Sequence, residues 1–88
     1  MRILSFRPEA FEEYQEWIRR DKKVALKIGM LIQDILNNPF TGLGKPELLK
    51  ANFKGYWSRR ISEEHRLIYK ITDESIIVFY CYSHYKDK

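Results

Sequence analysis

Three side chains in the second half of the sequence have the types that acid–base chemistry on a phosphate requires. They are Glu47 in a basic loop, Arg66 in an apolar strand pattern, and His84 near the end of the sequence. A carboxylate can accept a proton, and a histidine, with an ordinary pKa of about 6.5, can donate one near neutral pH. The planar guanidinium of arginine can hold two phosphate oxygens. Cleavage of RNA without metal needs a base for the 2'-hydroxyl, an acid for the departing 5'-oxygen and a cation on the phosphate, so we assign these roles to Glu47, His84 and Arg66 respectively.

The surroundings of these residues are strongly basic. The net charge is +4, and residues 45–70 alone hold seven Lys and Arg against three Glu. Four flat rings are interleaved with these cations, a combination that suits phosphates and unstacked bases. We predict that Lys45, Lys50, Arg59 and Arg60 bind RNA or phosphate, with Arg60 supporting Arg66.

Each of these features also has a simpler interpretation. A glutamate among lysines is often a surface ion pair, alternating arginines are often the solvated face of a sheet, and a histidine near the end of a chain is often merely exposed. His65, beside a turn, fits a structural role better than a catalytic one. Taken singly, none of these residues identifies an enzyme.

Several other kinds of site are absent from the sequence. It has no Gly-rich phosphate loop, no metal-binding pattern of His and Cys, and no nucleophile-elbow serine, so we expect neither metal nor cofactor. Cys81 is the only cysteine and cannot form a disulfide within the chain. No apolar run is long enough for a signal peptide core or a membrane span, so we expect a soluble cytoplasmic protein with one domain over residues 1–88.

The elements that must position these groups follow from the hydrophobic periodicity. Residues 2–6 predict a strand, and Pro8 suits the first turn of a helix whose apolar stripe would be Phe11, Tyr14, Trp17 and Ile18. Asp21 then predicts the cap of a second helix that ends at residues 37–39. Residues 39–55 predict a loop, and period-two patterns predict strands at 56–61, 65–71 and 76–83.

These elements predict a two-layer α+β domain in the order β-α-α-β-β-β, with both helices on one face of an antiparallel sheet. Alternation along the strands places Leu67, Tyr69 and Ile71 inward together with Ile77, Phe79 and Cys81. Arg66, Ile68 and Lys70 then point outward with Tyr80, Tyr82 and His84, and Arg60 lies opposite Arg66.

Several segments together resemble one known family. They are 44–50 (Gly-Lys-Pro-Glu-Leu-Leu-Lys), 55–61 (Gly-Tyr-Trp-Ser-Arg-Arg-Ile), 63–69 (Glu-Glu-His-Arg-Leu-Ile-Tyr) and the closing His84-Tyr85, with Tyr14, Trp17 and the 38–44 loop in addition. On these residues the sequence resembles the YoeB (Txe) toxins of the RelE-type superfamily over nearly its whole length. Lys86-Asp87-Lys88 continues beyond the tyrosine at which such sequences commonly end.

The resemblance implies a fold like that of the microbial ribonucleases and cleavage of mRNA in the A site of the 70S ribosome, which inhibits translation. The products would carry a 2',3'-cyclic phosphate or a 3'-phosphate. By position, Glu47 is implied as base, His84 as acid, Arg66 as stabiliser of the pentavalent phosphate, Lys50 and Arg60 as phosphate ligands, and Tyr85 as a catalytic-site residue that positions RNA. A cognate antitoxin of the YefM or Axe kind and a toxin homodimer in that complex are implied as partners.

Two other functions remain open on the sequence alone. A ribonuclease that needs no ribosome would cut naked RNA at a comparable rate. A non-catalytic inhibitory toxin of the same fold would use its basic face only for docking, which requires cations but no acid–base pair.

Overall fold

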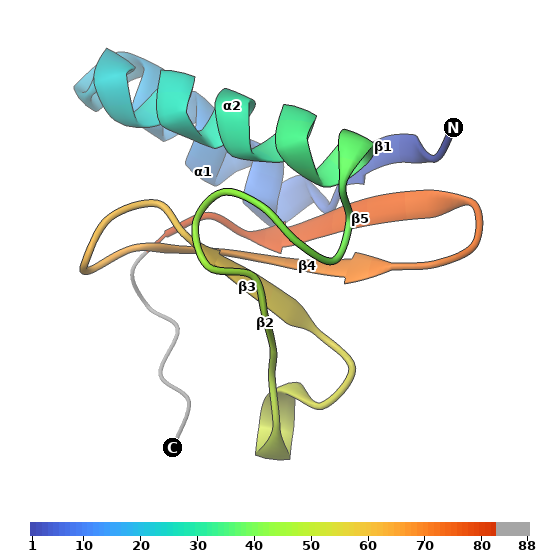
Figure 1. Ribbon diagram of the computed structural model, residues 1–88. Helices are drawn as coiled ribbons and strands as arrows, with labels where there is room; N and C mark the ends of the chain where they lie inside the picture. The colour runs from blue at the N-terminus through green and yellow to red at the C-terminus, as the bar shows by residue number, and fades with distance from the viewer. Residues whose placement is uncertain (83–88) are drawn as a thin grey trace.

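Two helices pack on one face of a five-stranded sheet in the computed structural model of the protein, which describes residues 1–82 (Figure 1). The elements in chain order are β1 (Ile3–Phe6), α1 (Pro8–Arg20), α2 (Lys22–Asn37), β2 (Glu47–Leu48), the single-turn helix η1 (Ala51–Phe53), β3 (Trp57–Arg60), β4 (Arg66–Ile71) and β5 (Ser75–Tyr80). This is the predicted α+β order, with β2 and η1 as short additions inside the segment predicted to be a loop.

The two helices begin and end where the sequence predicts. Pro8 occupies the first turn of α1, where its missing N–H costs nothing. The Asp21 carboxylate accepts hydrogen bonds from the backbone amides of Lys23 and Val24, so it caps α2 directly after α1 ends. The buried stripe of α1 agrees with the prediction in part: Trp17 is buried and Tyr14 packs against the core, but Phe11 and Ile18 are exposed and Ala10 is buried instead.

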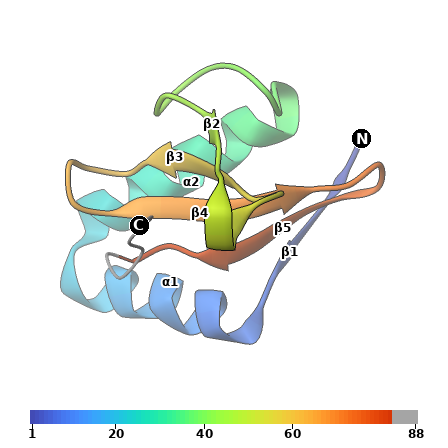
Figure 2. The ribbon, with the colours of Figure 1, turned by 90° about the horizontal axis from the view of Figure 1, so that it is seen from below.

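The sheet has the strand order β1-β5-β4-β3-β2. The pairs from β2 to β5 are antiparallel, as predicted for the β3-β4-β5 meander, but β1 lies parallel to β5 at the edge. Leu67, Tyr69, Ile76 and Val78 point toward the helices and complete the main core with Ile28, Leu31 and Ile35 of α2. We call the side of the sheet that faces α1 and α2 the helix-covered face, and the opposite side the open face (Figure 2).

The predicted facing of β5 is wrong in part. Tyr80 pairs with Ile68 on the open face, as predicted, but Ile77 pairs with Lys70 on that same face, and the buried Ile76 and Val78 point inward instead. The register shifts between Ile68 and Tyr69, so Phe79 is an additional residue in β5, a β-bulge. The bulge reverses the alternation, so Cys81 is buried as predicted although Ile77 and Phe79 are not inward.

Candidate active site

A row of paired residues, which we call the Glu47 row, crosses the open face of the sheet. Glu47 pairs with Ser58, Ser58 with Ile68, and Ile68 with Tyr80. Paired residues in neighbouring strands point to the same side, so the exposed Glu47 side chain belongs to the open face.

The next row along the strands is cationic. Arg60 pairs with Arg66, as predicted, and each lies two residues from a member of the Glu47 row, about 7 Å along its strand. Arg60 is exposed and Arg66 is half-buried. The open face therefore places one carboxylate and two guanidinium groups in adjacent rows.

Hydrogen bonds to a turn fix the position of Arg66. Its Nη1 donates to the carbonyl oxygens of Ser62 (2.8 Å), Glu63 (3.0 Å) and His65 (3.2 Å). Among residues 1–82, its Nε and Nη2 make no hydrogen bond of their own. One side of the guanidinium is thus held by the backbone while the other can donate to a ligand, an arrangement suited to holding an oxyanion.

The chain reaches Glu47 through an unusual backbone. Gly44 has φ +78° and Lys45 has φ +54°, a left-handed conformation that residues other than glycine seldom adopt. The Gly44 carbonyl accepts a hydrogen bond from the Arg60 amide (2.7 Å), which ties this turn to the end of β3. Lys45 and Lys50 are both exposed and lie on either side of β2, next to Glu47 as the sequence predicts.

Arg59 does not belong to this face, and the prediction that it binds phosphate is wrong. It pairs with Leu67 on the helix-covered face and is 0% exposed. All five of its N–H groups are used: Nε donates to the Tyr69 hydroxyl (3.0 Å), and Nη1 to the Asp34 carboxylate (2.5 Å). The other three donate to the backbone carbonyls of Asn38, Thr41 and Leu43. Arg59 therefore fixes the 38–44 loop to the core.

This hydrogen-bond network changes the acidity of its members. Asp34 accepts hydrogen bonds from the Leu43 amide (3.0 Å) and from Arg59, and these bonds hold the pKa of its carboxyl below the ordinary 3.8. Burial raises the pKa of the Tyr69 hydroxyl, although its bond to Arg59 opposes that effect. Asp34 is thus an anion at neutral pH, and Arg59 has a permanent partner.

His65 has a structural environment. Its ring packs edge-on against Trp17, with centroids 4.7 Å apart, and near Tyr82 at 5.4 Å. Its Nε2 is 3.8 Å from the Glu64 carboxylate, and its buried Nδ1 has no hydrogen-bond partner among residues 1–82. The histidine fills space between α1 and the end of the sheet and does not face the Glu47 row.

Two of the predicted site residues, His84 and Tyr85, lie outside the described residues. β5 ends at Tyr80, and the buried Cys81 and half-buried Tyr82 follow it. Within residues 1–82, no three His, Cys, Asp or Glu side chains come close enough to hold a metal ion. No helix in this range is long and apolar enough to cross a membrane.

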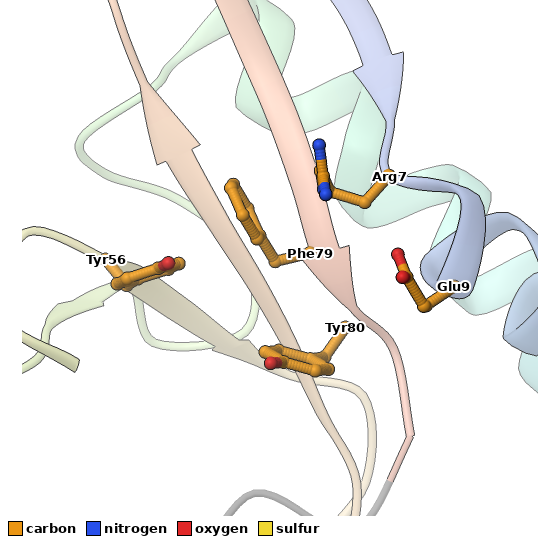
Figure 3. Close-up of a pocket in the computed structure, with 5 residues that line it drawn as sticks. All are labelled: Arg7, Glu9, Tyr56, Phe79 and Tyr80. Carbon is orange, nitrogen blue, oxygen red and sulfur yellow. The ribbon is translucent and has the colours of Figure 1, made fainter. Parts of the chain in front are cut away.

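The sequence interpretation missed one feature of the open face. A pocket of about 280 Å³ lies next to the Glu47 row (Figure 3) and is lined by Arg7, Glu9, Tyr56, Phe79 and Tyr80. Tyr56 is one of the four rings in the basic stretch, but strand alternation predicts that Phe79 lies in the core. Only the bulge in β5 brings Phe79 and Tyr80 to the same side, and alternation alone does not predict a bulge.

Known proteins resemble this chain closely in sequence and structure. Residues 6–85 match the family described as YoeB-like toxin of bacterial type II toxin-antitoxin system. Toxin YoeB of Escherichia coli K12 is 49% identical over 77 residues, which cover 88% of this chain and 92% of that protein.

Two solved structures from Staphylococcus aureus agree with this match. The YoeB dimer has a TM-score of 0.87 at 45% identity, covering 96% of this chain and 98% of that one. The YoeB-YefM complex has a TM-score of 0.88 at 43% identity, covering 97% and 99%. The open-face arrangement thus occurs on a backbone that these toxins share over nearly their whole length, and the chain belongs to the YoeB toxin family of bacterial type II toxin–antitoxin systems.

Proposed function

We propose that this toxin is a metal-independent endoribonuclease that cuts mRNA in the A site of the translating ribosome and so inhibits translation. The observation that supports this most is the open face itself, where Glu47 lies beside the Arg60–Arg66 pair with Lys45 and Lys50 flanking it. Docking on a polyanion needs cations, but an exposed carboxylate in their midst weakens such docking. A carboxylate at that place is explained if it accepts a proton.

The proposed reaction is an internal transfer within the RNA backbone. Glu47 removes the proton of a 2'-hydroxyl, and that oxygen attacks the adjacent phosphorus. Arg66, with its guanidinium held on one side by the 62–65 turn, stabilises the charge that develops on the phosphate oxygens. His84 protonates the 5'-oxygen as its bond to phosphorus breaks. The products are a 2',3'-cyclic phosphate, which water can open to a 3'-phosphate, and a 5'-hydroxyl end.

The remaining cations and Tyr85 have binding roles in this proposal. Arg60, Lys50 and Lys45 are exposed around Glu47 and neutralise the phosphates on either side of the cut bond. Tyr85 positions the RNA next to His84. Arg59 has no such role, because its donors are all used inside the protein.

The partners are proposed from the same family relation. A YefM-type antitoxin binds the toxin and blocks its access to the ribosome, and two toxin chains associate in that complex. The names of the related structures, a YoeB dimer and a YoeB-YefM complex, support both proposals. The site of action is the cytoplasm, where translating ribosomes are found.

Cleavage on programmed 70S ribosomes tests the reaction. We expect Glu47→Ala and His84→Gln each to lower the single-turnover cleavage rate by about 10²- to 10⁴-fold, while binding to the ribosome persists. Glu74→Ala, which removes an exposed acid from the turn before β5, is the matched control and should cleave normally. Unchanged cleavage in both site variants would refute the assigned roles.

The same assay separates the alternatives. Cutting of naked RNA at a rate comparable with that on ribosomes would favour a free ribonuclease. Growth arrest that persists when Glu47, Arg66 and His84 are replaced together would favour an inhibitory toxin that only docks.

A further inference from the structure

The pocket beside the Glu47 row contains both stacking surfaces and hydrogen-bonding groups. Tyr56, from the segment before β3, meets Phe79 edge to face, with ring centroids 4.9 Å apart and an interplanar angle of 81°. Arg7, the residue that precedes α1, and Glu9, in the first turn of α1, lie on the other side of Phe79 from Tyr56 (Figure 3). The volume of about 280 Å³ is small for a ligand pocket and suits one flat ring better than a peptide or a drug-sized molecule.

The rings are held in place by their neighbours. Phe53 of η1 lies edge-on to Tyr56 (5.8 Å between centroids) and to Tyr80 (6.4 Å). Tyr80 is nevertheless 41% exposed, so much of its surface remains open to a ligand. A ring that is fixed on one side and exposed on the other loses little conformational entropy when a second ring stacks on it.

The charges around the pocket favour a base over a phosphate inside it. Arg7 and Glu9 contribute opposite charges to the lining, so the pocket has no net cationic character. The Glu9 carboxylate would repel a phosphate, whereas it can accept a hydrogen bond from the amino group of a base. Two cations lie close to the lining rings: Arg7 Cζ is 5.8 Å from the Phe79 ring centroid, and Lys70 Nζ is 4.5 Å from that of Tyr56.

The register places the pocket within reach of the proposed reaction. Tyr80 is in the same row as Glu47, three strand spacings or about 14 Å away, and the backbone of Arg66 is roughly 8 Å from that of Tyr80. These distances correspond to one or two steps along an unstacked RNA strand. The cations of the Arg60–Arg66 row and Lys70 continue along the open face on either side of Ile68.

We propose that the pocket formed by Arg7, Glu9, Tyr56, Phe79 and Tyr80 binds one unpaired RNA base, one or two nucleotides from the bond that is cut. The base stacks on Tyr80, and Lys70 and Arg7 interact with the neighbouring phosphates. This subsite rests on the proposed ribonuclease function, and it adds a base-binding position that is separate from the reacting groups.

Cleavage kinetics with Tyr80→Ala test the subsite. With short mRNAs on programmed 70S ribosomes, we expect the toxin concentration for half-maximal cleavage to rise about 5- to 100-fold, the range for loss of one base stack, with little change in the rate at saturation. Tyr80→Phe keeps the ring, so we expect it to raise this half-maximal concentration much less. Phe11→Ala removes a comparably exposed ring on α1 and is the control. Thermal melting of each variant checks that it is folded.

Removal of single bases from the mRNA identifies the ligand. We expect one position near the cut at which an abasic nucleotide raises the half-maximal concentration of the wild-type toxin. The same abasic nucleotide should not raise the half-maximal concentration of Tyr80→Ala further. Equal half-maximal concentrations for wild type and Tyr80→Ala overturn the subsite while the proposed function stands. Absence of cleavage by the wild type refutes the proposed function instead. Unchanged RNA cleavage with weaker binding of Tyr80→Ala to the cognate antitoxin assigns the pocket to the antitoxin and also overturns the proposal.

Discussion

Arg59 and Arg60 are adjacent in sequence, and replacing each by methionine should have opposite consequences. Arg59 is fully buried and donates five hydrogen bonds, one of them to the Asp34 carboxylate. Arg60 is exposed on the open face beside Arg66. We therefore expect Arg59→Met to lower the free energy of unfolding, and Arg60→Met to lower RNA cleavage while leaving stability almost unchanged.

The size of the first effect follows from the contacts. Each of the five hydrogen bonds contributes about 0.5–1.5 kcal/mol net. The Asp34 carboxylate is partly exposed, so water can solvate it when Arg59 is removed, and the loss of the ion pair itself adds little more. We expect Arg59→Met to lose about 3–5 kcal/mol, a large part of the approximately 4–13 kcal/mol typical of a chain this long. Arg60→Met should lose less than about 0.5 kcal/mol, as do most surface substitutions.

Urea unfolding followed by tryptophan fluorescence measures both variants. Trp17 lies in the main core, and Trp57 packs near Phe40 of the 38–44 loop, with ring centroids 5.6 Å apart. Similar slopes with a lower midpoint for Arg59→Met would mean that native stability itself has fallen. A loss below about 1 kcal/mol, equal to that of Arg60→Met, would refute the assignment of Arg59 as the residue that fixes the loop.

Three further predictions concern the same structure. The Asp34 pKa is lowered in the folded state, so the stabilisation by its carboxylate is fully present above the ordinary pKa of 3.8 and is lost as the pH falls below that value. In Asp34→Asn the free energy of unfolding should therefore depend less on pH in that acidic range, as measured by circular dichroism against pH. Burial raises the pKa of the Cys81 thiol to about 12, so a disulfide reagent at pH 8 should label it only after unfolding, whereas prompt labelling of the native toxin would contradict its burial. Gly42 has φ +122° and a Cβ there would overlap the Asp34 carboxylate, so Gly42→Ala should lower the melting temperature by many degrees, while Gly29→Ala, where a Cβ meets nothing within 4 Å, should not lower it.

The helices and most of the sheet could be predicted from the sequence because their signals are local. The 3.6-residue period of α2, the Asp21 cap and Pro8 each act within a few residues of the element they define. The parallel position of β1 depends instead on β5, more than 65 residues later, and no local pattern specifies it. The same holds for η1, which is one turn long and has no periodicity to detect.

The candidate site was predictable to a similar degree. Residue types and the family resemblance were sufficient to select Glu47, Arg60 and Arg66, and the register places them together on the open face. Residue types and the family resemblance could not distinguish Arg59 from Arg60. Two adjacent arginines on a strand point to opposite faces, and the sequence does not show which of the two points to the core. The bulge at Phe79 is likewise a property of paired strands, so the aromatic pocket became apparent only with the register.

β5, the last strand to be synthesised, lies between β1 and β4 in the sheet, so under the proposed function it also determines when the toxin can first act during its own synthesis. Ile3 is among the first residues made, but its partner Ser75 follows 72 residues later. Domains fold as units during translation, and a strand without its neighbour has no sheet to join. The row from Glu47 to Tyr80 therefore does not exist until β5 has left the exit tunnel. Under the proposed function, a nascent toxin is harmless to the ribosome that is making it.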